Sequence, residues 1–396
     1  MNLERMKKEL GMKSCPECFA EIYEKIKNEW KQRSKLILSE GYVERILTDA
    51  KVLLPYMDTV LSAAAKVRKN EALCLLVCIL ETWVKNGGDI RTPDYMPPEG
   101  PGLDFDFFHL FAAVPTIPDS VKFHRDRNVP EDIIAATLQE YDYCFEMCRM
   151  NIGRIAFDKG RLVWICHTIN NELIRIGRFK YELPTKRVSG VRVYKNSKGE
   201  ILTLADGLHI HRTGRIVGSI YCEEEADSFV ANITETENEI VGHVITDGNV
   251  AREKTSFSRS EWELCLSKDD AVIPVHIPRD GDFDVDTIES SYARLREVMT
   301  ACFADMPYKA IHCHTWMMSR DLRKVLKPTS NILAFQKKYI HYPCKSEGTW
   351  VFGFVFPGEK GISGIESLSE GTSLQRNVKE LYKNGGAIYD ECGFFF

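Results

Sequence analysis

The chain has 396 residues, a formal net charge of −5 and 28% charged residues. This length allows a full hydrophobic core in two or three domains, and the charge balance lacks the excess of Lys and Arg typical of proteins that bind nucleic acids or membrane surfaces. The longest apolar run, residues 72–80, is too short to cross a bilayer, and the charged start lacks a signal-peptide core. The 13 cysteines show no regular spacing, which favours a reducing compartment. We therefore expect a soluble, cytoplasmic protein without a nucleic-acid or membrane partner.

Residues 15–148 carry mostly helical periodicity. Ser14 is a candidate N-cap with Glu17 three residues later, and apolar residues then follow at steps of three and four as far as Trp30, which predicts one amphipathic helix. The segment 70–85 is apolar nearly all round, so we expect it at the centre of a helical bundle. Further helices are predicted at residues 42–54, 56–67, 105–113 and after Pro130.

The pattern changes after Met150 to short alternating runs separated by Gly, Asn and Asp, which predict strands and hairpins. These strands are expected at residues 175–183, 190–195, 200–205, 208–212, 229–236 and 240–246. The sequence thus predicts an α+β protein, with a helical domain over residues 1–150 and a mixed β-sheet domain flanked by helices over residues 151–396.

Residues 271–339 read as strand, loop, helix, strand and helices. A strand (271–277) ends at Pro278, and an amphipathic helix (285–303) follows the turn. A second strand (309–314) precedes helices at 317–325 and 332–339. This order places His276, His312 and His314 near strand ends, where α/β folds usually hold ligands. Residues 350–356 (WVFGFVF) are predicted as a buried strand and 374–384 as a closing helix.

Three stretches carry a resemblance to a known family: LIRIGRFKYEL, VHIPRDGDFDVDTIESS and CHTWMMSRDLRKVLKPTSNILAFQKKY. They resemble a bacterial family of two-domain acyltransferases, in which a helical N-acyltransferase N-terminal domain precedes a GNAT-like C-terminal domain. The resemblance covers most of the chain. It implies transfer of an acyl group from acyl-coenzyme A, as co-substrate, to a small-molecule amine acceptor.

The loop at residues 279–284 stands where a GNAT-like fold holds the pyrophosphate of coenzyme A. The superfamily uses a Q/R-x-x-G-x-G/A loop there, whereas this loop has one glycine and three aspartates, which repel phosphate at short range. The nearest copy of the motif, residues 215–220, ends in Ile and lies well before the loop. The resemblance assigns Arg279, Gly281, Ser290 and Ser291 to the donor side, although serines on helices are usually solvated or bonded to the preceding turn.

Acyl transfer to an amine needs a base, and His276 is the first candidate because imidazole titrates near neutral pH. His314 is the second candidate. The competing interpretation is that His276 only closes its strand, and that His312 and His314 are polar caps at a strand end. Since His312 and His314 share one face of a strand, Cys313 points to the other face, which argues against Cys313 as a nucleophile activated by His314.

The family pattern also points to Trp316, Asn331 and Gln336 as substrate-binding residues. For two of them a structural role competes with this expectation. Asn331 can begin a helix together with Ser330, and Trp316 can pack under the sheet.

No metal is expected. His209/His211 and His312/His314 are spaced to share a strand face, but no third ligand has a diagnostic spacing, and Cys15-x-x-Cys18 lacks a second pair. Two alternatives to the transferase remain open. One is a non-catalytic GNAT-like ligand-binding protein, which the acidic loop favours, and the other is a metal-dependent hydrolase. The oligomeric state is not encoded in these patterns.

Overall fold

The computed structural model describes residues 1–359 and 361–396. The chain divides into two compact units, Met1–Ile176 and Gly177–Phe396. We expected the boundary after residue 150, but the first unit extends to Ile176. The reason is that Lys159–Ile169 forms a further helix that packs on helices of the first unit. Within the described ranges, every helix lacks either the length or the apolar character that a membrane span requires.

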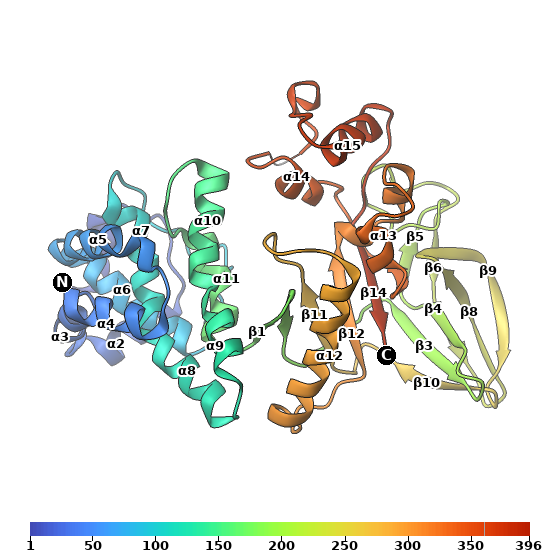
Figure 1. The fold of residues 1–396 in the computed structure, drawn as a ribbon, viewed down its shortest axis with the longest axis horizontal. Helices are drawn as coiled ribbons and strands as arrows, with labels where there is room; N and C mark the ends of the chain where they lie inside the picture. The colour runs from blue at the N-terminus through green and yellow to red at the C-terminus, as the bar shows by residue number, and fades with distance from the viewer. Residues whose placement is uncertain (360) are drawn as a thin grey trace. The chain divides into compact units, whose positions relative to one another are not determined.

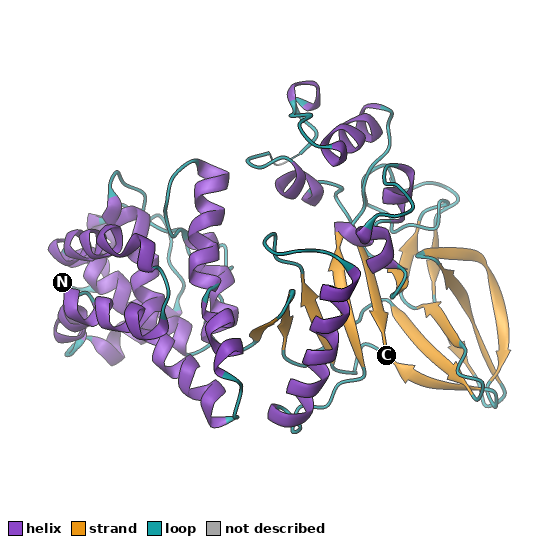
Figure 2. Ribbon diagram, in the orientation of Figure 1, coloured by secondary structure: helices purple, strands orange, loops and turns teal. Residues whose placement is uncertain are grey.

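The first unit is helical, as the sequence predicts (Figures 1 and 2). Its helices are α1 (Leu3–Glu9), α2 (Cys18–Ile26), α3 (Trp30–Ile37), α4 (Glu40–Ala50), η1 (Leu54–Tyr56), α5 (Met57–Lys69), α6 (Glu71–Lys85), α7 (Leu103–Ala113), η2 (Val114–Thr116), α8 (Ile117–Asp126), α9 (Glu131–Leu138), α10 (Glu140–Ile152) and α11 (Lys159–Ile169). A short strand, β1 (Leu173–Ile176), ends the unit.

Helix α6 is the centre of this bundle. All its residues from Ala72 to Glu81 are buried, and it contacts α1, α2, α3, α5 and α7. Asn70 caps the helix, since its Oδ1 accepts hydrogen bonds from the backbone N–H groups of Ala72 and Leu73 at 3.1 Å. The single helix expected from Ser14 to Trp30 is wrong: α2 ends at Ile26, and Trp30 begins α3.

The second unit combines sheets and helices. Its strands are β2 (Phe179–Glu182), β3 (Val191–Asn196), β4 (Ile201–Ala205), β5 (Leu208–Ile210), β6 (Phe229–Ala231), β7 (Thr234–Glu235), β8 (Glu239–Thr246), β9 (Asn249–Ser258), β10 (Trp262–Leu266), β11 (Val272–His276), β12 (Ala310–Thr315), β13 (Ile340–Pro343) and β14 (Glu391–Phe395). Its helices are α12 (Val285–Cys302), η3 (Trp316–Met318), η4 (Arg320–Lys324), α13 (Asn331–Gln336), α14 (Trp350–Val355), η5 (Ile365–Ser367) and α15 (Ser373–Lys383).

The central sheet of the second unit has the strand order β2-β11-β12-β14-β13, in which β11 and β12 are parallel and the other neighbours antiparallel. A second sheet has the order β10-β3-β4-β8-β7, with β9 paired to β8, and β5 pairs with β6. This mixed sheet domain with flanking helices confirms the predicted fold class (Figure 2).

The two faces of the central sheet have different neighbours. Helix α12 covers one face (Figure 1). There the ring of Tyr292 packs 5.2 Å from that of Phe179 and 5.0 Å from that of Phe395. On the other face Val272 and Phe394 belong to one buried apolar cluster with residues of the second sheet, such as Val193. Side chains alternate between the faces along each strand, so the register decides which residues meet.

Two predictions for the C-terminal region are wrong, and two strands there were not predicted. Residues 350–356 form the helix α14, and the buried positions Val351, Phe352 and Val355 follow helical spacing while Trp350 is exposed. The helix expected at 317–325 is instead two 3₁₀ turns, because Ser319 between them has a non-helical ψ of 121°. Strands β13 and β14 were not predicted, yet β14 lies between β12 and β13 in the central sheet.

Candidate active site

The ends of β11 and β12 bring two predicted histidines to one edge of the central sheet. The parallel register pairs Pro274 with His312 and Val275 with Cys313. Side chains in register on parallel neighbours share a face, so the next positions, His276 and His314, belong to the same face as His312. The order expected from the sequence, with both strands ending side by side, is present in the structure.

His276 is hydrogen-bonded to a buried glutamate. Its Nε2 lies 2.8 Å from Oε1 of Glu182 on the antiparallel neighbour β2, and its side chain is 33% exposed. The other carboxylate oxygen of Glu182 accepts hydrogen bonds from Nη2 and Nε of Arg187 at 2.7 and 3.2 Å. Burial disfavours the charged carboxylate, but the bonds from His276 and Arg187 outweigh burial and lower the pKa of Glu182 to about 2. Glu182 is therefore ionised at neutral pH and fixes the orientation of the imidazole.

His312 is buried, and its hydrogen-bond partner is a tyrosine. Its Nε2 is 2.7 Å from the hydroxyl of Tyr342 on β13. Burial, and then the charges of His314 and Arg187, lower the pKa of His312 to about 3, so the ring is neutral at physiological pH. Cys313, between the two histidines, is fully buried on the other face, and burial raises the pKa of its thiol. A thiol in this state is a poor nucleophile.

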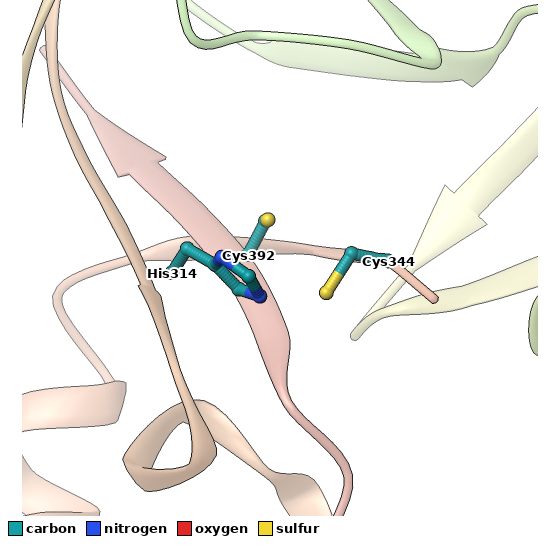
Figure 3. Close-up of side chains that lie close together, drawn as sticks. All are labelled: His314, Cys344 and Cys392. Atoms are coloured by element: carbon teal, nitrogen blue, oxygen red, sulfur yellow. The ribbon is translucent and has the colours of Figure 1, made fainter. Parts of the chain in front are cut away.

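His314 is exposed and lies against two cysteines, Cys344 and Cys392 (Figure 3). A hydrogen bond with Cys344 raises the pKa of His314. The second candidate base thus has thiols as its neighbours, whereas His276 has a carboxylate. Only the His276 arrangement matches the base-and-carboxylate pair that enzymes commonly use for proton transfer.

Arg178 contacts the loop after β11. Nη2 of Arg178 donates a hydrogen bond to the carbonyl of Pro278 at 2.9 Å, and its guanidinium lies 5.2 Å from the ring centre of Phe283. Gly281 has φ of +86°, a left-handed conformation that favours glycine. Arg279 and Gly281 are both exposed, so the loop presents them to solvent.

The start of α12 is capped by the protein itself. Oδ1 of Asp284 accepts a hydrogen bond from the backbone N–H of Thr287 at 2.9 Å, and Oδ2 accepts one from its hydroxyl at 2.6 Å. These bonds lower the pKa of Asp284. Ser290 is exposed on α12, but Ser291 is buried with its Oγ 2.8 Å from the hydroxyl of Tyr181. Ser291 therefore lies against the sheet and not beside the loop.

The three predicted substrate-binding residues have different surroundings. Trp316 is buried in an apolar cluster with residues of α14 and α15. Gln336 is buried as well, and its Nε2 donates hydrogen bonds to the carbonyl oxygens of Met317 and Ser319 at 2.8 and 2.9 Å. Asn331 is exposed at the start of α13, where the hydroxyl of Ser330 accepts a bond from Ile332. The capping contact comes from Ser330, as one of the two interpretations anticipated.

Four residues with polar roles at this edge were not among the predicted site residues: Glu182, Arg187, Cys344 and Cys392. Glu182 stands inside the stretch LIRIGRFKYEL that carries the family resemblance, so the signal for it was available. The sequence gives no such signal for the two cysteines. Cys392 lies on β14 and Cys344 follows β13, and neither strand was predicted.

Two family models match the chain. Residues 173–395 match the model of a GNAT-like C-terminal domain, and residues 49–170 match that of an N-acyltransferase N-terminal domain. These ranges leave the helices before residue 49 outside either model. No curated protein sequence matches the chain.

Solved structures of acyltransferases have the same fold. One, described as an acyltransferase in complex with decanoyl-CoA and teicoplanin, aligns with a TM-score of 0.62 at 16% identity over 100% of this chain and 99% of its own. Another, in complex with CoA and 10C-teicoplanin, gives a TM-score of 0.63 at 15% identity over the same shares. At these identities the likeness establishes the fold over the full length.

Proposed function

This chain belongs to the family with a GNAT-like C-terminal domain, and we propose that it is an acyltransferase that moves an acyl group from acyl-coenzyme A to an amine. The N-acyltransferase model that matches residues 49–170 supports an amine as the acceptor. The observation that carries the mechanism is the hydrogen bond between His276 and the Glu182 carboxylate at the end of β11.

The imidazole of His276 is the general base in this proposal. Its Nε2–H donates to Glu182, so Nδ1 is the basic nitrogen of the neutral ring. The acceptor amine gives a proton to His276 while its nitrogen bonds to the thioester carbonyl carbon. The carbon–sulfur bond then breaks and coenzyme A leaves as a thiolate, which takes up the proton that His276 received from the amine, so the imidazole returns to its neutral form. Glu182 stabilises the imidazolium that forms in the first step.

The loop at residues 279–284 and the start of α12 are the proposed donor side. Arg279 supplies an exposed positive charge beside the Gly281 turn. The aspartate cap on α12 occupies an amide that a phosphate would otherwise bind. We therefore propose that the pyrophosphate is held by the exposed side chains of the loop and of Ser290, with no contribution from Ser291.

The related structures suggest which compounds to test. They hold decanoyl-CoA and a teicoplanin derivative, so medium-chain acyl-CoA donors and amine-bearing glycopeptides are reasonable first substrates. The assay measures release of the coenzyme A thiol with a series of acyl-CoA donors, in the presence and absence of each amine. The matched variants are His276→Gln and His209→Gln, since His209 is an exposed histidine on β5 of the same unit.

The proposal predicts amine-dependent thiol release that is lost in His276→Gln and retained in His209→Gln. Thermal shift with the same donors separates the remaining alternatives. Stabilisation by acyl-CoA without thiol release from any amine would favour the non-catalytic ligand-binding protein. If no donor stabilises the protein and no donor releases thiol, the assignment of acyl-CoA as co-substrate is overturned.

A further inference from the structure

Three side chains with metal-binding atoms meet on the central sheet beside His314. The imidazole nitrogen of His314 and the sulfur atoms of Cys344 and Cys392 all lie within 4.8 Å of one another. Figure 3 shows the imidazole and the Cys344 sulfur pointing toward the same space, with Cys392 on the strand behind them. No disulfide joins the cysteines.

The strand order explains why these residues meet. Strand β14 lies between β12 and β13, and its antiparallel register pairs His314 with Cys392 and Tyr342 with Cys392. Cys344 comes two residues after Tyr342 and so returns to the same face. The donors thus come from the adjacent strands β12 and β14 and from the residue that follows β13, so the strand order places them together before any ion binds.

Neighbouring groups fix the positions of the cysteines. The thiol of Cys344 is 3.3 Å from the carbonyl oxygen of Asp390, and Oγ of Ser346 accepts a hydrogen bond from the backbone N–H of Asp390 at 2.8 Å. The same hydroxyl donates to the Asp390 carboxylate at 2.7 Å. Asp390 is buried, and its negative charge acts on His314.

We propose that His314, Cys344 and Cys392 form a zinc-binding site. Two thiolates and one imidazole are a soft donor set that suits Zn²⁺ over Mg²⁺ or Ca²⁺, which prefer oxygen ligands. The two thiolates neutralise the charge of the ion. With three protein ligands and an exposed histidine, one coordination position is left for water or another small ligand.

The donor atoms must draw slightly together when the ion binds. Tetrahedral zinc with ordinary bond lengths holds sulfur and nitrogen ligands roughly 3.5–4 Å apart, somewhat closer than the 4.8 Å limit of this cluster. Rotation of an exposed imidazole and of a half-buried thiol can supply this adjustment. The site differs from the His-x-His pairs considered from the sequence, because the second and third ligands are cysteines on neighbouring strands.

The experiment uses the full-length protein, purified in the presence of a reductant that does not bind metals, and Zn²⁺ or Co²⁺ alone. Zinc affinity is measured by competition with a chromophoric chelator. Co²⁺ serves as a spectroscopic probe, because thiolate ligands give a near-ultraviolet charge-transfer band and tetrahedral coordination gives intense visible bands. No acyl donor is present, so the result is independent of the proposed acyl transfer.

The variants are Cys344→Ser, Cys392→Ser and His314→Gln, with Cys15→Ser/Cys18→Ser as the matched control. The control removes two half-buried cysteines of the first unit that stand three residues apart in the chain. We expect one zinc ion per chain in the wild type and the control, and at least a roughly 100-fold weaker affinity in each of the three variants. Because Cys392 is buried, Cys392→Ser is the variant that affects folding most. His314→Gln changes an exposed residue and therefore tests zinc binding without this effect.

Two results would overturn this assignment. One is zinc affinity that is unchanged in His314→Gln and Cys344→Ser but lost in the Cys15/Cys18 control. The other is bound Co²⁺ without a thiolate charge-transfer band in the wild type.

Discussion

His276 Nε2 lies 2.8 Å from Glu182 Oε1, although 94 residues separate the two in the chain. The antiparallel pairing of β2 with β11, which sets His276 opposite Lys180 and Val275 opposite Tyr181, brings them together. Arg187 holds the second oxygen of the carboxylate. The pair is thus built into the sheet, with its acidic member buried and its basic member partly open to solvent.

Glu182→Gln should lower kcat for acyl transfer by roughly 10- to 100-fold, because the uncharged amide no longer stabilises the imidazolium of His276. The acidic limb of the pH–rate profile should move to lower pH for the same reason. The measurement is kcat as a function of pH, with Glu253→Gln, an exposed residue of β9, as the control. A reduced kcat with an unmoved acidic limb would indicate that Glu182 acts only on the structure.

The same carboxylate should make stability depend on pH in the acid range. Since the pKa of Glu182 falls from 4.5 to about 2 on folding, its contribution is present above pH 4.5 and is lost as the pH falls toward 2. The full contribution is about 3 kcal/mol at roughly 1.4 kcal/mol per pH unit. Urea unfolding of the wild type and of Glu182→Gln across this pH range measures the contribution of Glu182 to the free energy of unfolding. Parallel pH dependences in the two proteins would contradict this contribution.

His312 should destabilise the fold in mild acid. Its pKa is lowered from 6.5 to about 3, so below pH 6.5 the unfolded chain binds a proton that the folded chain does not. The free energy of unfolding then falls by about 1.4 kcal/mol per pH unit for this one residue. His312→Gln removes the titration, so its unfolding free energy should fall less steeply between pH 6.5 and pH 5 than that of the wild type. Equal slopes would show that His312 is protonated in the folded protein.

Gln336→Leu should lower the free energy of unfolding by roughly 2–4 kcal/mol, because the carbonyl groups of Met317 and Ser319 lose their donor. Asn331→Ala, which alters an exposed side chain of the same helix, should change stability by less than about 0.5 kcal/mol. Chemical denaturation of the two variants tests this. If Gln336→Leu kept wild-type stability and only raised KM, the residue would contact substrate.

Local signals in the sequence predicted the framework of the site. Pro278 marks the end of β11, the acidic first turn marks α12, and both strand ends carry histidines as expected. The partner of His276 depends on the register between β2 and β11, a non-local property that no spacing within one segment encodes. For this reason Glu182 was seen only as part of a motif.

The C-terminal region was harder to predict because its apolar runs have no single periodicity. Residues 350–356 are apolar on every side, which fits a buried strand or a buried helix equally well. Strand β14 is buried along its whole length and shows no alternation. Because β14 was not predicted, the position of Cys392 beside His314 was not predicted either.

The most direct measurement of the central claim is kcat for amine acylation by His276→Gln at saturating acyl-CoA and amine, followed as release of the coenzyme A thiol. The account predicts a loss of roughly 10²- to 10⁴-fold at neutral pH, with an unchanged KM for acyl-CoA. A kcat within about twofold of the wild type would contradict the role of His276 as the base.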